Sequence, residues 1–117
     1  MKLTETQFGD VTPIDGYGPG FFRIGGEVCE GPVLLTLTGV RSWGGYEDRE
    51  AVLALAGEID VIFFGTGAEI AHIAPDLRDA IEAAGMGAEV MNTPAACRTW
   101  NVLAAEGRRV AMAAYPV

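Results

Sequence analysis

Reactive and anion-binding side chains cluster near the start of a predicted helix late in the chain. Thr93 is a residue type that caps helix N-termini, and Pro94 suits the first helical position. The next two turns carry four further candidate site residues: Cys97, Arg98, Thr99 and Asn101. The positive end of a helix dipole can hold an anion or lower the pKa of a thiol. The pattern therefore predicts a candidate site, but it names no reaction.

Cys97 is a candidate nucleophile in this helix, and a cysteine nucleophile also needs a base. The chain has one histidine, His72, in a predicted loop between a strand and a helix. A small cysteine facing the core is the commoner arrangement, since free cysteine is among the most buried residue types. We therefore expect Cys97 to be buried and slow to react, and we predict no catalytic residue.

Two interpretations stay open for Arg98, Thr99 and Asn101. They could line a groove with Thr93 and bind phosphate or carboxylate. Equally, Thr99 and Asn101 could hydrogen-bond local backbone while Arg98 pairs with an acid such as Glu89.

Gly65-Thr66-Gly67 directly follows a short apolar strand, at the place where open α/β sheets bind ligands. A dinucleotide-binding fingerprint needs a third glycine and an immediate helix, whereas residues 68–74 intervene before Pro75. We therefore expect no Rossmann cofactor site and interpret the segment as a tight turn. The alternative is a small-molecule or anion site, or an enzyme site, that uses the Gly65–Gly67 amides and the Thr93 helix start.

Trp43 is a large aromatic residue in the glycine-flanked segment Arg41-Ser42-Trp43-Gly44-Gly45. It could act as a lid over the sheet edge or as an exposed interface anchor. Packing in the core is the interpretation that we favour.

The charge balance and the cysteine content exclude several classes of function. Sixteen acidic residues stand against eight basic ones, a net charge of −8, which disfavours nucleic acid and anionic membranes as partners. One histidine and two distant cysteines predict no zinc site, and we expect no cofactor. No apolar run approaches a membrane span and no secretory or transit signal is visible, so we expect no membrane insertion, reduced thiols and a cytoplasmic location.

The predicted elements change character along the chain. An antiparallel hairpin over 21–24 and 27–29 turns at Gly25-Gly26 and precedes a strand over 33–37. From there helices and strands alternate: helix 48–56, strand 60–64, helix 75–84, strand 88–91, helix 94–106 and strand 109–114. The alternation predicts right-handed crossovers from residue 33 onward. We predict one α/β domain over residues 1–117: a layered sandwich with a central mixed, mostly parallel sheet flanked by helices, plus an N-terminal antiparallel β-hairpin portion.

The chain resembles a family of unknown function that occurs in bacteria, archaea and eukaryotes. The resemblance covers nearly the whole chain and is most specific from Met91 to Arg108. It is carried by the following residues: Ile14-Asp15-Gly16-Tyr17, Phe22, Gly31-Pro32, Trp43, Gly65-Thr66-Gly67, Gly85, Thr93, Ala96, Cys97, Thr99, Asn101 and Glu106-Gly107-Arg108.

The resemblance implies a layered α/β fold and a role in assembling other proteins. Eukaryotic members of the family include a mitochondrial respiratory complex I assembly factor and an adipogenesis-associated protein. The family offers no established catalytic residues to carry over. The resemblance therefore favours a non-enzymatic assembly or protein-interaction factor, for example for a membrane or respiratory complex, with an unknown protein partner. A direct complex I role is less expected, because this chain shows no transit peptide. The oligomeric state stays open.

Overall fold

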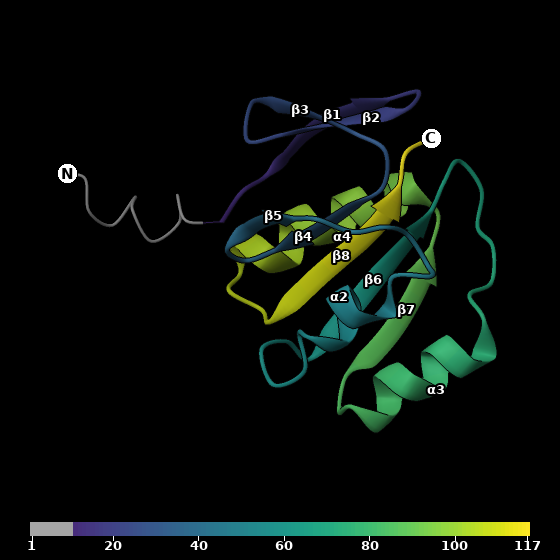
Figure 1. Cartoon of the computed structure of the whole chain (residues 1–117). Helices are drawn as coiled ribbons and strands as arrows, with labels where there is room; N and C mark the ends of the chain where they lie inside the picture. Colours follow the sequence, from purple (N-terminus) through teal and green to yellow (C-terminus); the bar gives the residue numbers. More distant parts are fainter. Residues whose placement is uncertain (1–10) are drawn as a thin grey trace.

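A five-stranded mixed sheet forms the centre of the structure, a computed structural model that describes residues 11–117 (Figure 1). Parallel pairing joins the three strands that lie at one side of the sheet, whereas the remaining strands pair in antiparallel fashion. In order across the sheet, the strands are β5 (Gly39–Arg41), β4 (Val33–Thr36), β8 (Val110–Tyr115), β6 (Val61–Thr66) and β7 (Gly87–Met91). The predicted class, a layered α/β fold with a mixed sheet, is confirmed.

Helices and a second sheet cover both faces of the central sheet (Figure 1). Helices α2 (Arg49–Leu53) and α3 (Pro75–Ala83) pack on one face. Helix α4 (Thr93–Ala105) packs on the other, beside a three-stranded antiparallel sheet. The strands of this smaller sheet are β1 (Ile14–Gly18), β2 (Phe21–Ile24) and β3 (Glu27–Glu30).

Strand β6 is central, as its uninterrupted apolar sequence predicts. Ile62 and Phe64 pack with α2 and α3, while Phe63 packs with α4 and the small sheet. Because both faces of β6 are buried, the strand has no need of a polar side. The predicted hairpin is also confirmed: Gly25 and Gly26 have φ of 59° and 84°, the two positive values that a type I′ turn requires.

Three features differ from the sequence-based prediction: the direction of β4, the extent of the first helix, and two additional strands. Strand β4 is antiparallel to β8, so the link from β4 to β6 is not a parallel crossover. Of the helix expected over 48–56, only the residues of α2 are helical. The residues after α2 form turns that are closed by i→i+3 hydrogen bonds. Strands β1 and β5 were not predicted.

Within residues 11–117, no helix is long and apolar enough to cross a membrane.

Candidate functional site

The carboxyl ends of β6 and β8 meet the start of α4, as expected for the predicted site at this sheet edge. The N-cap of α4, however, is Asn92 and not Thr93: the Asn92 side chain accepts a hydrogen bond from the Ala95 amide at 2.9 Å. Asparagine and threonine are both good caps, and they are adjacent here, so the sequence pattern assigned the cap one residue too late.

Thr93 is fully buried and ties three segments together. Its Oγ1 accepts the Gly67 amide at 2.8 Å and donates to the Tyr115 carbonyl at 2.6 Å. The Thr93 amide donates in turn to the Gly67 carbonyl at 2.8 Å. The hydroxyl thereby joins the end of β6, the start of α4 and the end of β8.

Gly65 allows this close approach. A Cβ at Gly65 would lie 2.9 Å from both the Ala114 Cβ and the Thr93 Oγ1, and 3.2 Å from the Thr93 Cα. Because one of these neighbours is backbone, α4 would have to move away from β6 to accept any side chain here. The absence of a side chain at Gly65 therefore allows α4 to pack closely on β6.

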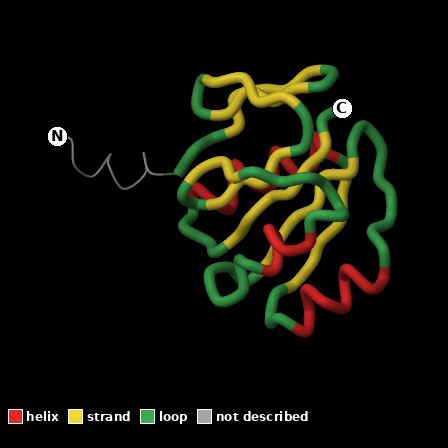
Figure 2. The backbone as a smooth tube through the Cα atoms, viewed as in Figure 1, coloured by secondary structure: helices red, strands yellow, loops and turns green. Residues whose placement is uncertain are grey.

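The Thr66 hydroxyl organises the long loop between β6 and α3, which Figure 2 shows as an extended connection. It donates a hydrogen bond to the Glu69 carbonyl at 2.7 Å, and the Met91 carbonyl is a second, longer acceptor at 3.3 Å. The hydroxyl also accepts a hydrogen bond from the Ala71 amide at 3.0 Å. The polar groups of Thr66 and the amide of Gly67 thus already have partners within the chain. An anion at this edge would have to displace them.

Cys97 lies in the core against the sheet, with 4% of its surface exposed. Burial raises the pKa of the Cys97 thiol to about 11, although the nearby Arg98 charge lowers it in part. The expected burial is confirmed. The helix start does not lower the pKa of the thiol, because desolvation has the larger effect. His72, the candidate base, lies exposed in the loop before α3.

We predict that Cys97 reacts slowly with thiol reagents in the native protein. With a pKa near 11, roughly one thiol in a thousand is ionised at about pH 8, and burial excludes the reagent as well. Alkylation followed by mass spectrometry should label the half-buried Cys29 first, while both thiols should react alike in denaturant. Rapid labelling of Cys97 in a folded Cys29→Ser variant would contradict the prediction.

The remaining polar residues of α4 point in different directions. The Arg98 side chain is exposed and takes part in no ion pair within residues 11–117, with Glu89 or any other acid. The Thr99 hydroxyl contacts the Met91 sulfur at 3.7 Å. Asn101 accepts the Ile14 amide at 2.9 Å and donates to the Ile14 carbonyl at 3.0 Å, which docks β1 on α4. Arg98 and Thr99 line one shallow hollow on the outer face of α4, but neither Thr93 nor Asn101 contributes to it, so the four residues do not form one groove.

Trp43 is a core residue, in agreement with the interpretation that we favour. It is 6% exposed and packs among aromatic rings, with the Tyr115 ring centroid 5.5 Å away and the Tyr46 centroid 6.0 Å away. Its Nε1 has no hydrogen-bond partner among residues 11–117. Burial also raises the pKa of Tyr46, with a smaller contribution from the nearby Tyr115. The cluster holds the Gly45 turn against the end of β8, where the Tyr46 amide donates to the Tyr115 hydroxyl at 2.9 Å.

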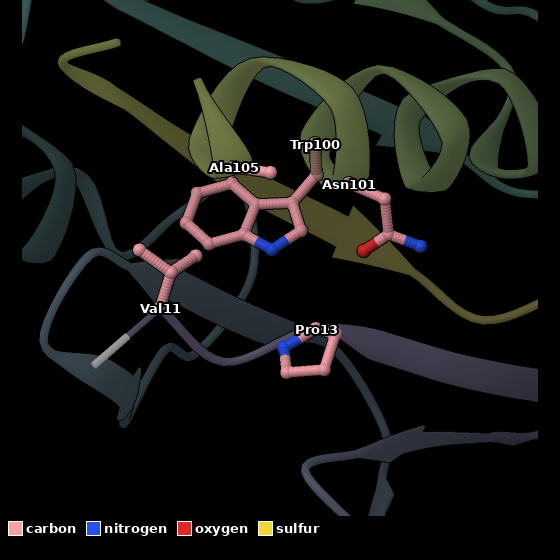
Figure 3. A pocket seen from close by; sticks show the side chains of 5 residues that line it. All are labelled: Val11, Pro13, Trp100, Asn101 and Ala105. Atoms are coloured by element: carbon pink, nitrogen blue, oxygen red, sulfur yellow. The ribbon is translucent and has the colours of Figure 1, made fainter. Parts of the chain in front are cut away.

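A cavity of about 240 Å³, which no sequence pattern predicts, lies beside Trp100. Figure 3 shows the indole of Trp100 between α4 and the segment that carries Val11 and Pro13. The Trp100 Nε1 donates to the Thr12 carbonyl at 3.0 Å, and the Asn101 amide is held by Ile14. The polar groups of Trp100 and Asn101 are thus hydrogen-bonded to the docked segment, and the surface that these residues present to the cavity is mainly apolar. The described residues contain no cluster of three or more possible metal ligands.

Comparisons with known proteins agree with this fold. The chain is 47% identical to an uncharacterized protein of Rhodobacter capsulatus over 117 residues, which cover all of this chain and 94% of that protein. It is 30% identical to NADH dehydrogenase [ubiquinone] 1 alpha subcomplex assembly factor 3 of Mus musculus over 99% of the chain. The human protein of that name is 28% identical, also over 99% of the chain. The chain spans about two thirds of those assembly factors, 66% of the mouse protein and 67% of the human one.

Solved structures share the architecture. A crystal structure described as an outer membrane protein from Bartonella henselae superposes with a TM-score of 0.83 at 34% identity, covering 92% of this chain and 96% of that one. A solution structure of a Bordetella pertussis protein, described as an Mth938-like domain, gives a TM-score of 0.78 at 26% identity, covering 99% and 92%. The family model described as protein of unknown function (DUF498/DUF598) matches residues 14–115. The chain therefore belongs to this family.

Proposed function

We propose that the protein is an assembly factor that acts through protein–protein contacts, for a membrane or respiratory complex, and that it catalyses no reaction. The observation that carries the proposal is the similarity to the complex I assembly factors, which spans nearly the whole chain. A similarity of this length includes both sheets and all three helices of residues 11–117, and not one motif alone.

The arrangement of the candidate site supports the absence of catalysis. Nucleophilic catalysis needs a nucleophile, a base within reach and a group that orients the base. The Cys97 thiol is buried and protonated, whereas His72 is exposed in a loop. The Thr93 hydroxyl is already bonded to Gly67 and Tyr115. Cys97 and Thr93 instead hold α4 on the sheet, through apolar packing and through hydrogen bonds respectively.

The proposal predicts a defect in complex assembly when the gene is deleted in the native host. Native gel electrophoresis with an NADH dehydrogenase activity stain should show less mature complex and more subassemblies. A plasmid with the wild-type gene should restore the complex. The Cys97→Ala variant should restore it equally, because the proposal requires no thiol chemistry.

Two results would count against the proposal. An unchanged level of mature NADH dehydrogenase in the deletion strain would exclude a role in assembling that complex. Failure of a stable Cys97→Ala protein to restore assembly would point to thiol chemistry instead. Cross-linking of the tagged protein during assembly, followed by mass spectrometry, would then identify the subunits that it contacts.

A further inference from the structure

The outer face of α4 carries an exposed apolar side chain and, beside it, an open hollow. Val102 points away from the sheet with 56% of its surface exposed, since Cys97, Trp100 and Ala104 form the buried face of the same helix. Beside Val102 is a hollow of about 320 Å³, lined by Arg98, Thr99, Val102 and Leu103. A branched apolar knob and an apolar-edged hollow therefore lie on one helix face.

The positions of these residues match the commonest way in which helices pack. Arg98, Val102 and Glu106 are spaced four residues apart and form one ridge, and Thr99 and Leu103 begin the next. The hollow is the groove between the two ridges. Ridges of this spacing interdigitate when two helices cross at about 50° with axes roughly 8–10 Å apart.

The charges on the ridge are arranged symmetrically about Val102. Arg98 lies one turn before Val102, and Glu106, the C-cap residue, lies one turn after it. Both side chains are exposed, and neither takes part in an ion pair within residues 11–117. The two are eight residues apart, about 12 Å along the helix axis, and they do not pair with each other in one copy.

We propose that this face of α4 binds the same face of a second copy of the chain, in an antiparallel pair around a two-fold axis near Val102. Val102 of each copy enters the hollow of the other. The antiparallel direction brings Arg98 of one copy beside Glu106 of the other, and the two-fold axis creates this pair twice. One surface thus supplies the knob, the hollow and both charges.

The self-complementary charges favour a second copy over an unrelated partner. A patch with one positive and one negative end repels itself in the parallel direction and attracts itself in the antiparallel direction. A contact of one helix pair falls below the roughly 1,200–2,000 Å² of a standard interface, so the dimer is weak and depends on concentration. The inference does not depend on the proposed function.

Sedimentation equilibrium over micromolar to millimolar protein concentrations tests the pairing. The wild type should show a monomer–dimer equilibrium that added salt weakens, because the ion pairs are exposed. The Val102→Asp variant should remain monomeric, because it places two carboxylates at the two-fold axis. Single reversals of charge, Arg98→Glu or Glu106→Arg, should each raise the dissociation constant by at least about tenfold.

The double variant Arg98→Glu/Glu106→Arg provides the sharpest test, because it exchanges the two charges and should restore a dissociation constant close to that of the wild type. Val40→Asp and Arg23→Glu make the same chemical changes at exposed sites in β5 and β2 and should leave the equilibrium unchanged. Circular dichroism melting curves verify that each variant is folded.

Three outcomes would overturn the inference. A wild type that is monomeric at every concentration shows that the face does not pair. A dimer that persists in Val102→Asp lies on another surface. A double variant no tighter than the single reversals contradicts the antiparallel register.

Discussion

Replacement of Thr93 by valine is expected to lower the free energy of unfolding by about 3 kcal/mol, because a buried amide and a partly buried carbonyl lose their partner at once. The Gly67 amide donates to the Thr93 hydroxyl, and the Tyr115 carbonyl accepts from it. Valine is close to threonine in volume but offers neither a donor nor an acceptor. Urea unfolding followed by circular dichroism measures the difference.

The Thr93→Ser variant is the matched control. Serine keeps the hydroxyl and loses one buried methyl group, so its loss should be about 1 kcal/mol. The difference between the two variants then isolates the hydrogen bonds from the packing. Equal losses in both variants would show that the hydroxyl contributes nothing beyond its volume.

Replacement of Trp100 by alanine is expected to lower the free energy of unfolding by about 4 kcal/mol, within the range for large aromatic residues in cores. Trp100 is fully buried, packs in the core between α4 and the two sheets, and binds the Thr12 carbonyl through its Nε1. The variant therefore loses both a large apolar surface and a contact that docks the N-terminal segment. Chemical unfolding with the same protocol gives the value.

The Trp100→Phe variant separates these two contributions, because it keeps an aromatic ring and removes the donor. We expect this variant to lose roughly half as much stability as Trp100→Ala. Its amide hydrogen exchange, relative to the wild type, should accelerate more in β1 than in β7. A Trp100→Ala loss below about 1 kcal/mol would mean that the core closes around the vacancy.

The sequence predicts the central part of the fold well because local patterns suffice there. The uninterrupted apolar run of β6 indicates a strand buried on both faces, and Gly25-Gly26 indicates a primed turn. Strand β5 has only three residues, and β1 contains two glycines, so neither carries an alternating pattern. The direction of β4 depends on its pairing with β8, which lies far away along the chain.

The candidate site was harder to predict because its residues act through distant partners. Thr93 looks like a cap in the sequence, yet its hydroxyl bonds Gly67 and Tyr115, which are 26 and 22 residues away. Asn101 reaches Ile14 across 87 positions. Helix periodicity correctly indicates which residues lie together on α4, but it does not reveal which other segment each side chain meets.

The position of β8 has a consequence for folding during synthesis. β8 is the last strand of the described residues, and it lies between β4 and β6 in the middle of the central sheet. A nascent chain that lacks β8 therefore leaves β4 and β6 with open edges of unpaired backbone groups, the kind of surface that promotes aggregation. The central sheet can close only after residue 115 has left the ribosome, so these two edges stay unpaired until then.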